Sequence, residues 1–185
     1  MVRVVIVGGG AAGASAAARA RRLDPSAEVV LIERGSMITH APCGMPYAIG
    51  GIVKSHEELM TYSPEEFERE RNIKVLIRTE VIDVDVDKRV VVVKRGETTE
   101  KIAWDKLVIA TGAKPLVPNL PGVELKGILT MRHPDEVPHL KGHLEKAKTV
   151  AVVGGGYIGV EMAEVLLEMG KRVLLFEMFD QVLPA

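Results

Sequence analysis

Residues 2–33 read "VRVVIVGGGAAGASAAARARRLDPSAEVVLIE". Residues 2–7 are a β-branched apolar run, which is typical of a strand buried on both faces. A glycine turn follows, and then a segment rich in Ala and Arg, two residues that favour helix. Residues 29–33 form a second apolar strand. Strand, helix and strand within about 30 residues predict a βαβ unit in a parallel sheet with a right-handed crossover.

The same pattern returns at residues 149–177, "TVAVVGGGYIGVEMAEVLLEMGKRVLLFE". Each copy carries a G-x-G-x-x-G loop, formed by Gly8, Gly10 and Gly13 and by Gly154, Gly156 and Gly159. Such glycines make a tight turn, let a pyrophosphate approach the backbone and let the helix pack closely on the strand. Each copy also ends in an acid, Glu33 or Glu177, placed to accept hydrogen bonds from a ribose. The repeat therefore predicts two dinucleotide sites.

The remaining segments extend this α/β pattern. Ser63, Pro64 and Glu66 form a capping box that predicts a helix start, and residues 73–77 predict a third strand. Residues 80–103 alternate apolar and polar side chains around turn signals, so they predict an antiparallel meander. A further strand begins at residue 105, a Pro- and Gly-rich linker covers residues 114–127, and residues 134–146 predict a helix.

Composition excludes several classes of protein. The 185 residues are 47% hydrophobic, enough for a real core, and the net charge of −1 shows no basic excess of the kind that nucleic-acid binders carry. No apolar run approaches the length of about 18 residues that a membrane span needs. One cysteine excludes an internal disulfide, so we expect a cytoplasmic protein. Few Asn and Gln among many charged residues are typical of adaptation to heat.

The order of these motifs resembles the pyridine nucleotide–disulfide oxidoreductases, which are flavoproteins with two dinucleotide sites. The resemblance covers essentially the whole chain. It implies an α/β fold with a Rossmann-like FAD-binding domain over residues 1–113, containing a parallel sheet and the antiparallel meander. A linker and connecting helix over residues 114–148 would follow, and then the first half of a Rossmann-like NAD(P)H-binding domain over residues 149–185.

The resemblance also implies the residues that hold the cofactors. The FAD contacts would be Gly8, Gly10, Ala11, Ala12, Gly13, Glu33, Arg34, Val81, Ala110, Thr111 and Gly112. The NAD(P)H contacts would be Gly154, Gly156, Tyr157, Ile158, Gly159 and Glu177. Glu161 matches a family glutamate near the flavin, and the alternative is an exposed helix carboxylate.

The choice of nicotinamide favours NADH. Glu177 would repel a 2′-phosphate, and Met178 and Phe179 follow where an NADP site often supplies an arginine. Lys171 and Arg172 lie just before the strand, so NADPH stays an alternative. No metal site is expected, because the five histidines have no cysteine partners at zinc spacing.

The single cysteine, Cys43, lies in the Gly- and Pro-rich segment "THAPCGMPYAIGG", residues 39–51. Its place resembles the single-cysteine branch of the family: coenzyme A disulfide reductases, NADH oxidases and peroxidases, and persulfide or sulfur reductases. The resemblance implies a catalytic thiolate that forms a mixed disulfide or cycles through sulfenic acid. A helix start after Cys43 would favour that thiolate. The alternative is a buried, inert thiol.

Substrate contacts are also implied by the resemblance. Ser15, Arg19, Arg22 and Arg71 match positions that contact coenzyme A in the branch, and guanidinium groups suit its phosphates. Thr39 and His40 are further candidates. A solvated helix face explains the first-helix arginines equally well, and His40 is either a proton donor near the flavin or a structural histidine.

Two departures bear on the branch. Ala11 stands where the oxidases and peroxidases commonly carry a histidine, so a peroxidase-like mechanism lacks its usual proton-transfer partner. Pro42 replaces an asparagine of the CoA disulfide reductases.

We therefore expect an oxidoreductase in which NADH reduces FAD and electrons pass to a disulfide or persulfide, with CoA disulfide favoured, through Cys43. The alternatives are an NADH oxidase with dioxygen as acceptor, and a non-catalytic dinucleotide-binding fragment. The family chain is longer, so the segment that closes the FAD site, the rest of the nicotinamide domain and a dimerisation domain would lie beyond residue 185. The full-length protein is expected to be a homodimer that binds neither nucleic acid nor membrane.

Overall fold

The computed structural model describes residues 1–184. The chain divides into two compact units. The first unit comprises Met1–Ala41 and Met60–Lys114, and the second comprises Pro42–Leu59 together with the residues from Pro115 onward. The segment that carries Cys43 therefore belongs by its contacts to the second unit.

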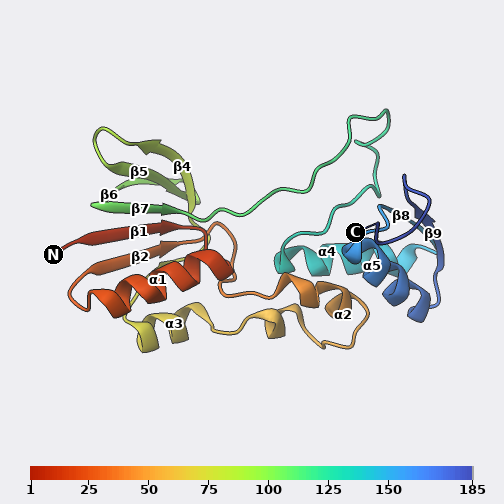
Figure 1. The fold of residues 1–185 in the computed structure, drawn as a ribbon, viewed down its shortest axis with the longest axis horizontal. Helices are drawn as coiled ribbons and strands as arrows, with labels where there is room; N and C mark the ends of the chain where they lie inside the picture. The colour runs from red at the N-terminus through yellow and green to blue at the C-terminus, as the bar shows by residue number, and fades with distance from the viewer. Residues whose placement is uncertain (185) are drawn as a thin grey trace. The chain divides into compact units, whose positions relative to one another are not determined.

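A parallel sheet forms the centre of the first unit (Figure 1). Its strands lie in the order β3 (Lys74–Leu76), β2 (Glu28–Ile32), β1 (Arg3–Val7) and β7 (Lys106–Ile109). Helix α1 (Ala11–Leu23) joins β1 to β2, which confirms the predicted βαβ unit. Val5 lies opposite Val30 on one side and Leu107 on the other, so β1 is a central strand.

The two faces of this sheet are covered differently (Figure 1). On one face, Ile6 and Leu31 pack with Ala14 and Ala17 of α1. On the other face, Val5 packs with Val91 of the antiparallel meander. The meander consists of β4 (Glu80–Asp85), β5 (Val90–Arg95) and β6 (Thr98–Ala103), as predicted.

Helix α3 (Pro64–Arg71) begins at the predicted capping box. The Ser63 hydroxyl accepts a hydrogen bond from the Glu66 N–H at 3.1 Å, and the Glu66 carboxylate accepts one from the Ser63 N–H at 2.9 Å. Two amides that a helix start would leave unpaired are thus satisfied.

The second unit contains the repeated βαβ pattern. Strands β8 (Thr149–Val153) and β9 (Arg172–Phe176) pair in parallel and are joined by α5 (Tyr157–Glu168). The predicted helix over 134–146 forms as the 3₁₀ turn η3 (Pro134–Glu136) and α4 (Val137–Lys146). Residues 42–59 add η1 (Pro42–Gly44), α2 (Met45–Ile49) and η2 (His56–Leu59).

The core of this unit lies between its helices and one face of its sheet. Met45 and Ile49 of α2 pack with Leu140 of α4 and Leu166 of α5, and Val150 borders the same cluster.

The NAD(P)H-binding region predicted over residues 149–185 ends at residue 185, which lies outside the described residues. No helix within residues 1–184 combines the length and the apolar character needed to cross a bilayer.

Candidate functional site

The first glycine loop connects β1 to α1 and is built by close backbone contacts. Gly8 has φ of +106°, and a Cβ atom there would lie 2.2 Å from the Ala110 carbonyl oxygen. A Cβ atom on Gly13 would lie 1.8 Å from the Gly8 carbonyl oxygen. The first glycine thus permits the left-handed turn, and the third permits the helix to approach the strand.

The second glycine loop repeats this geometry. Gly154 also has φ of +106°, and a Cβ atom on Gly159 would lie 1.8 Å from the Gly154 carbonyl oxygen. The N-cap residues Gly10 and Gly156 share an extended backbone, with ψ of −171° and −175°. Two loops far apart in the sequence therefore have one backbone conformation.

Both loops leave room for a phosphate. A Cβ atom on Gly156 would meet nothing within 4 Å, and one on Gly10 would meet only the His40 Cε1 atom at 3.8 Å. The first helical hydrogen bonds are donated by Ala14 to Gly10 and by Val160 to Gly156, so the preceding amides are free of helical acceptors. Helix-terminal amides beside an open space fit a pyrophosphate.

Each predicted ribose acid accepts a hydrogen bond from the glycine that lies between the first two motif glycines of its own loop. The Glu33 carboxylate accepts hydrogen bonds from the Gly9 N–H at 2.7 Å and the Gly35 N–H at 2.6 Å. The Glu177 carboxylate accepts one from the Gly155 N–H at 2.5 Å. A carboxylate has about four acceptor sites, so both acids keep capacity for a ribose hydroxyl.

The backbone amides around Glu177 lower the pKa of its carboxyl below the usual value. The largest contribution comes from the Phe179 N–H, followed by those of Gly155 and Met178. These groups donate to the charged form, which they therefore favour.

The other predicted FAD contacts follow the carboxyl ends of strands in the parallel sheet, except Val81, which lies at the start of β4 in the antiparallel sheet. The Ala110 N–H donates to the Val7 carbonyl at 2.7 Å, which places Ala110 beside the first loop, and Thr111 and Gly112 follow it. Arg34 pairs with Glu80 at 3.8 Å, and Val81 is the next residue of β4. Arg34 and the segment from Ala110 to Gly112 thus lie at the carboxyl edge of the parallel sheet, where open α/β sheets bind nucleotides.

Cys43 lies in the 3₁₀ turn η1, and α2 begins two residues later, as predicted. Its thiol is free and exposed. The alternative of a buried cysteine is therefore wrong as to burial. An exposed thiol on a turn is accessible to a substrate.

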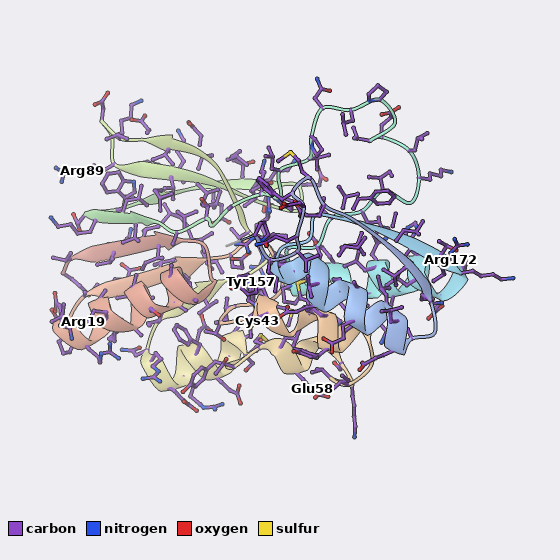
Figure 2. The ribbon with its side chains drawn as sticks, turned by 45° about the vertical axis from the view of Figure 1, so that its right-hand side comes forward. Arg19, Cys43, Glu58, Arg89, Tyr157 and Arg172 are labelled. Atoms are coloured by element: carbon purple, nitrogen blue, oxygen red, sulfur yellow. The ribbon has the colours of Figure 1, made fainter. Side chains whose placement is uncertain are left out.

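The implied CoA contacts on α1 share one helix face. Ser15, Arg19 and Arg22 are all exposed, and Arg19 is labelled on that helix in Figure 2. The buried residues of α1 are Gly13, Ala14 and Ala17. The two arginines are therefore available to an anion.

Arg71, Thr39 and His40 have partners within the first unit. The Arg71 guanidinium donates to the Tyr62 hydroxyl at 3.1 Å and lies 5.4 Å from the centre of that ring. Thr39 is hydrogen bonded to Tyr62 through its hydroxyl, and His40 forms an isolated antiparallel bridge with Met60. Sequence reasoning did not single out Tyr62, which contacts two of the three.

Two further predictions concern the second unit. Tyr157 and Ile158 are exposed at the start of α5, and Glu161 is half-buried rather than exposed. Among residues 1–184, no group of three or more His, Cys, Asp or Glu side chains is placed to hold a metal ion. The His139 and His143 rings stack edge to face with centroids 4.7 Å apart.

Sequence reasoning also missed Leu183. Its N–H donates to the Gly155 carbonyl at 2.8 Å, just as the Thr39 N–H donates to the Gly9 carbonyl at 2.8 Å. Both residues lie six positions after the acid of their copy. Aligning the two copies beyond their acids would have revealed the pair.

Comparison with known proteins supports this geometry. A family model described as "Pyridine nucleotide-disulphide oxidoreductase" matches residues 2–185. The NAD(P)H sulfur oxidoreductase (CoA-dependent) of Pyrococcus abyssi is 44% identical over 182 residues, which are 97% of this chain and 40% of that protein. An NADH oxidase of Methanocaldococcus jannaschii is 39% identical over 99% of this chain and 42% of its own length.

A solved structure titled as an NAD-dependent persulfide reductase from A. fulgidus has a TM-score of 0.93 at 36% identity. The match covers 100% of this chain and 35% of that one. These similarities confirm the fold class and the family that the sequence predicts. The chain spans about two fifths of the length of the curated relatives described above.

Proposed function

The chain belongs to the pyridine nucleotide-disulphide oxidoreductases, and on that premise we propose that it is the N-terminal part of an NAD(P)H-dependent FAD flavoprotein. The enzyme reduces a disulfide or persulfide through Cys43, with CoA disulfide as the favoured substrate. The observation that carries the proposal is the pair of glycine loops with one backbone geometry. Two dinucleotide-type loops in one chain suit electron transfer between two cofactors.

The chain's own residues bind and orient the cofactors. The first loop and the Ala110–Gly112 segment hold FAD, with Glu33 on its ribose, and the second loop holds NADH with Glu177 in the same role. NADPH is the alternative donor. When bound, FAD would supply the redox chemistry, that is, the transfer of two electrons from the nicotinamide to sulfur.

Cys43 supplies the nucleophile. Its thiolate attacks one sulfur of the substrate disulfide, which forms a mixed disulfide and releases one substrate thiolate. Two electrons that originate from NADH then cleave the mixed disulfide, which releases the second thiolate and restores Cys43. The balance is one disulfide, one NADH and one proton consumed for two thiols and one NAD⁺.

The CoA assignment rests on charge and exposure. Arg19 and Arg22 are exposed on one face of α1, with Ser15 one turn before Arg19. Guanidinium groups bind phosphates well. The relative from Pyrococcus abyssi is described as CoA-dependent, which agrees with this assignment.

NADH oxidase activity is the second candidate. The relative from Methanocaldococcus jannaschii carries that name. Ala11 stands where the oxidases commonly have a histidine, but His40 lies beside Gly10 of the same loop and could move the proton. We further propose that the longer protein is a cytoplasmic homodimer.

The test compares acceptors and a cysteine variant in the longer protein. NADH oxidation is measured with CoA disulfide, CoA persulfide, polysulfide and dioxygen. Cys43→Ser is expected to abolish disulfide reduction while FAD binding and the reduction of bound FAD by NADH are retained. Disulfide turnover by Cys43→Ser would contradict the proposed mechanism.

A shorter experiment addresses the 185-residue chain itself. FAD is added, excess is removed, and the visible absorption spectrum is recorded. Retained flavin bands would show that the 185-residue chain holds the cofactor without further chain. A colourless protein would assign binding to the longer protein and favour the fragment alternative for this chain.

A further inference from the structure

Residues 42–59, which carry Cys43, leave the first unit after Ala41 and rejoin it at Met60. We infer that Thr39 is a positioning residue that holds these two chain ends together and ties them to the first glycine loop. The inference rests on the proposed function and deepens it. It assigns Thr39 a positioning role that is distinct from the substrate contact implied by the family resemblance.

Thr39 makes four hydrogen bonds, all with backbone groups of the first unit. Its N–H donates to the Gly9 carbonyl at 2.8 Å, and its carbonyl accepts from the Thr61 N–H at 3.2 Å. Its hydroxyl accepts from the Tyr62 N–H at 2.9 Å and donates to the Tyr62 carbonyl at 3.0 Å. The next residue, His40, forms the antiparallel bridge with Met60.

The two bonds with Tyr62 use the whole donor capacity of the Thr39 hydroxyl and one of its two acceptor sites. A hydroxyl carries one hydrogen, and the Thr39 hydrogen is donated to Tyr62. A substrate acceptor could receive it only if the bond between the two chain ends broke. Thr39 also holds together the two ends of residues 42–59, and Cys43 lies four positions after Thr39.

The backbone of Thr39 is strained in a way that requires such support. Its φ is +49°, in the left-handed region. A β-branched residue is a genuine outlier there. Strained residues persist only where the surrounding structure holds them in place, and they cluster at functional sites.

The second copy of the repeat separates the two roles of Thr39. Leu183 has φ of +50° and donates its N–H to the Gly155 carbonyl, so the anchor on the loop is common to both copies. Leucine has no hydroxyl, so the paired bonds with Tyr62 belong to the copy that precedes Cys43. The Thr39 hydroxyl therefore holds the two ends of residues 42–59 together, and the Thr39 backbone anchors the first glycine loop.

The first arm of the test needs neither cofactor nor activity. Amide hydrogen exchange is measured in the 185-residue chain for Thr39→Val, which removes the hydroxyl but keeps the shape, and for Thr39→Ser, which keeps the hydroxyl. Loss of the bond is expected to speed exchange at the Tyr62 amide about tenfold in Thr39→Val. Thr39→Ser is expected to match the unmodified chain. Thr99→Val, on the exposed strand β6, is the matched control.

Unchanged exchange at Tyr62 in Thr39→Val would overturn the inference. Equal acceleration in Thr39→Ser would also overturn it, because the hydroxyl would then be irrelevant. If the Thr39→Val chain does not fold, Thr39→Ser still decides the question. A native exchange pattern in Thr39→Ser would then show that folding requires the hydroxyl at position 39.

The second arm uses the longer enzyme. A positioning residue lowers kcat for disulfide reduction with KM retained, whereas a substrate contact raises KM with kcat retained. We expect kcat to fall about tenfold in Thr39→Val and to return in Thr39→Ser. A raised KM at unchanged kcat would overturn the inference. Absence of disulfide reduction in the unmodified enzyme would contradict the proposed function instead, and the exchange arm would still decide the role of Thr39.

Discussion

Three arginines within four positions of α1 have different surroundings. Arg19 and Arg22 are exposed, whereas Arg21 is half-buried. The Arg21 guanidinium donates to the carbonyls of Pro25 at 2.9 Å and Ala27 at 2.5 Å, and reaches the Asn72 carbonyl at 2.5 Å. It therefore closes the end of α1 and links it to the end of α3. Similar side chains on one helix thus differ in role: Arg21 is structural, whereas Arg19 and Arg22 are exposed and available for the proposed binding.

This division predicts that the same replacement, Arg to Met, has different effects at the two positions. Arg21→Met should lower the free energy of unfolding by about 2 kcal/mol, because charged hydrogen bonds to three carbonyls are lost. Arg19→Met should change it by less than about 0.5 kcal/mol, and should instead raise the KM for CoA disulfide in the longer enzyme. Urea unfolding and steady-state kinetics check the pair. Equal losses of stability would contradict the assignment.

The sequence could not distinguish these arginines, because the Asn72 carbonyl lies 51 positions further along the chain. The same limit applies to Thr39 and Leu183, since left-handed backbone in threonine or leucine has no local sequence signal. The glycine loops were predictable to the residue, because only glycine permits their turns and close approaches. Exposure of Cys43 also required the structure, since no residue pattern reports it.

Among the elements, the glycine loop and helix α4 offer a contrast between two glycines. Gly8→Ala should lower the free energy of unfolding by at least about 2 kcal/mol, because Gly8 has φ of +106° and a Cβ atom would lie 2.2 Å from the Ala110 carbonyl oxygen. Gly142→Ala should raise it by about 0.7 kcal/mol. Gly142 lies within α4, and a Cβ atom there would meet nothing within 4 Å. Denaturant titration measures both, and a stabilising Gly8→Ala would refute the account of the turn.

The second loop is expected to respond to acid through Glu177. Its carboxyl has a pKa lowered from 4.5 by the Phe179, Gly155 and Met178 amides. A carboxyl with a lowered folded pKa contributes stability above its unfolded pKa and loses it as pH falls through the folded value. The Gly155 amide resonance should therefore titrate with a midpoint below 4.5. Glu177→Gln should abolish that titration, and a midpoint at or above the ordinary value would show that the amides do not favour the carboxylate.

Local signals predicted the elements well where local bonds determine them. The capping box at Ser63 fixes the start of α3 through two hydrogen bonds three residues apart. The second repeat differs from expectation in burial rather than in shape. Its strands have the same apolar pattern as β1 and β2, yet Val153 is 80% exposed and Phe176 is 55% exposed. The burial of a strand depends on which other segments cover it, and the sequence of the strand itself does not reveal them.

At the scale of the whole molecule, the sheet of the second unit has one uncovered face. Ala151 lies opposite Leu174, and Val153 lies opposite Phe176, so four exposed apolar residues share that face. On the other face, Val150, Val152 and Val173 pack against the core. Parallel sheets are normally covered on both sides. The chain also matches only about two fifths of its relatives' length, and we propose that further chain of the longer protein covers the open face.

The open face predicts that the 185-residue chain alone binds a hydrophobic dye and self-associates, because contiguous apolar surface of this kind favours both. Phe176→Lys, at the end of β9 on the exposed face, should reduce dye fluorescence and association, since a charge is costly to bury in a dry contact. Leu23→Lys is the matched control, because Leu23 is 67% exposed at the end of α1 in the first unit. The longer protein should bind little dye at the same residues. Strong dye binding that persists in the longer protein, and is unaffected by Phe176→Lys, would contradict the assignment of this face to further chain.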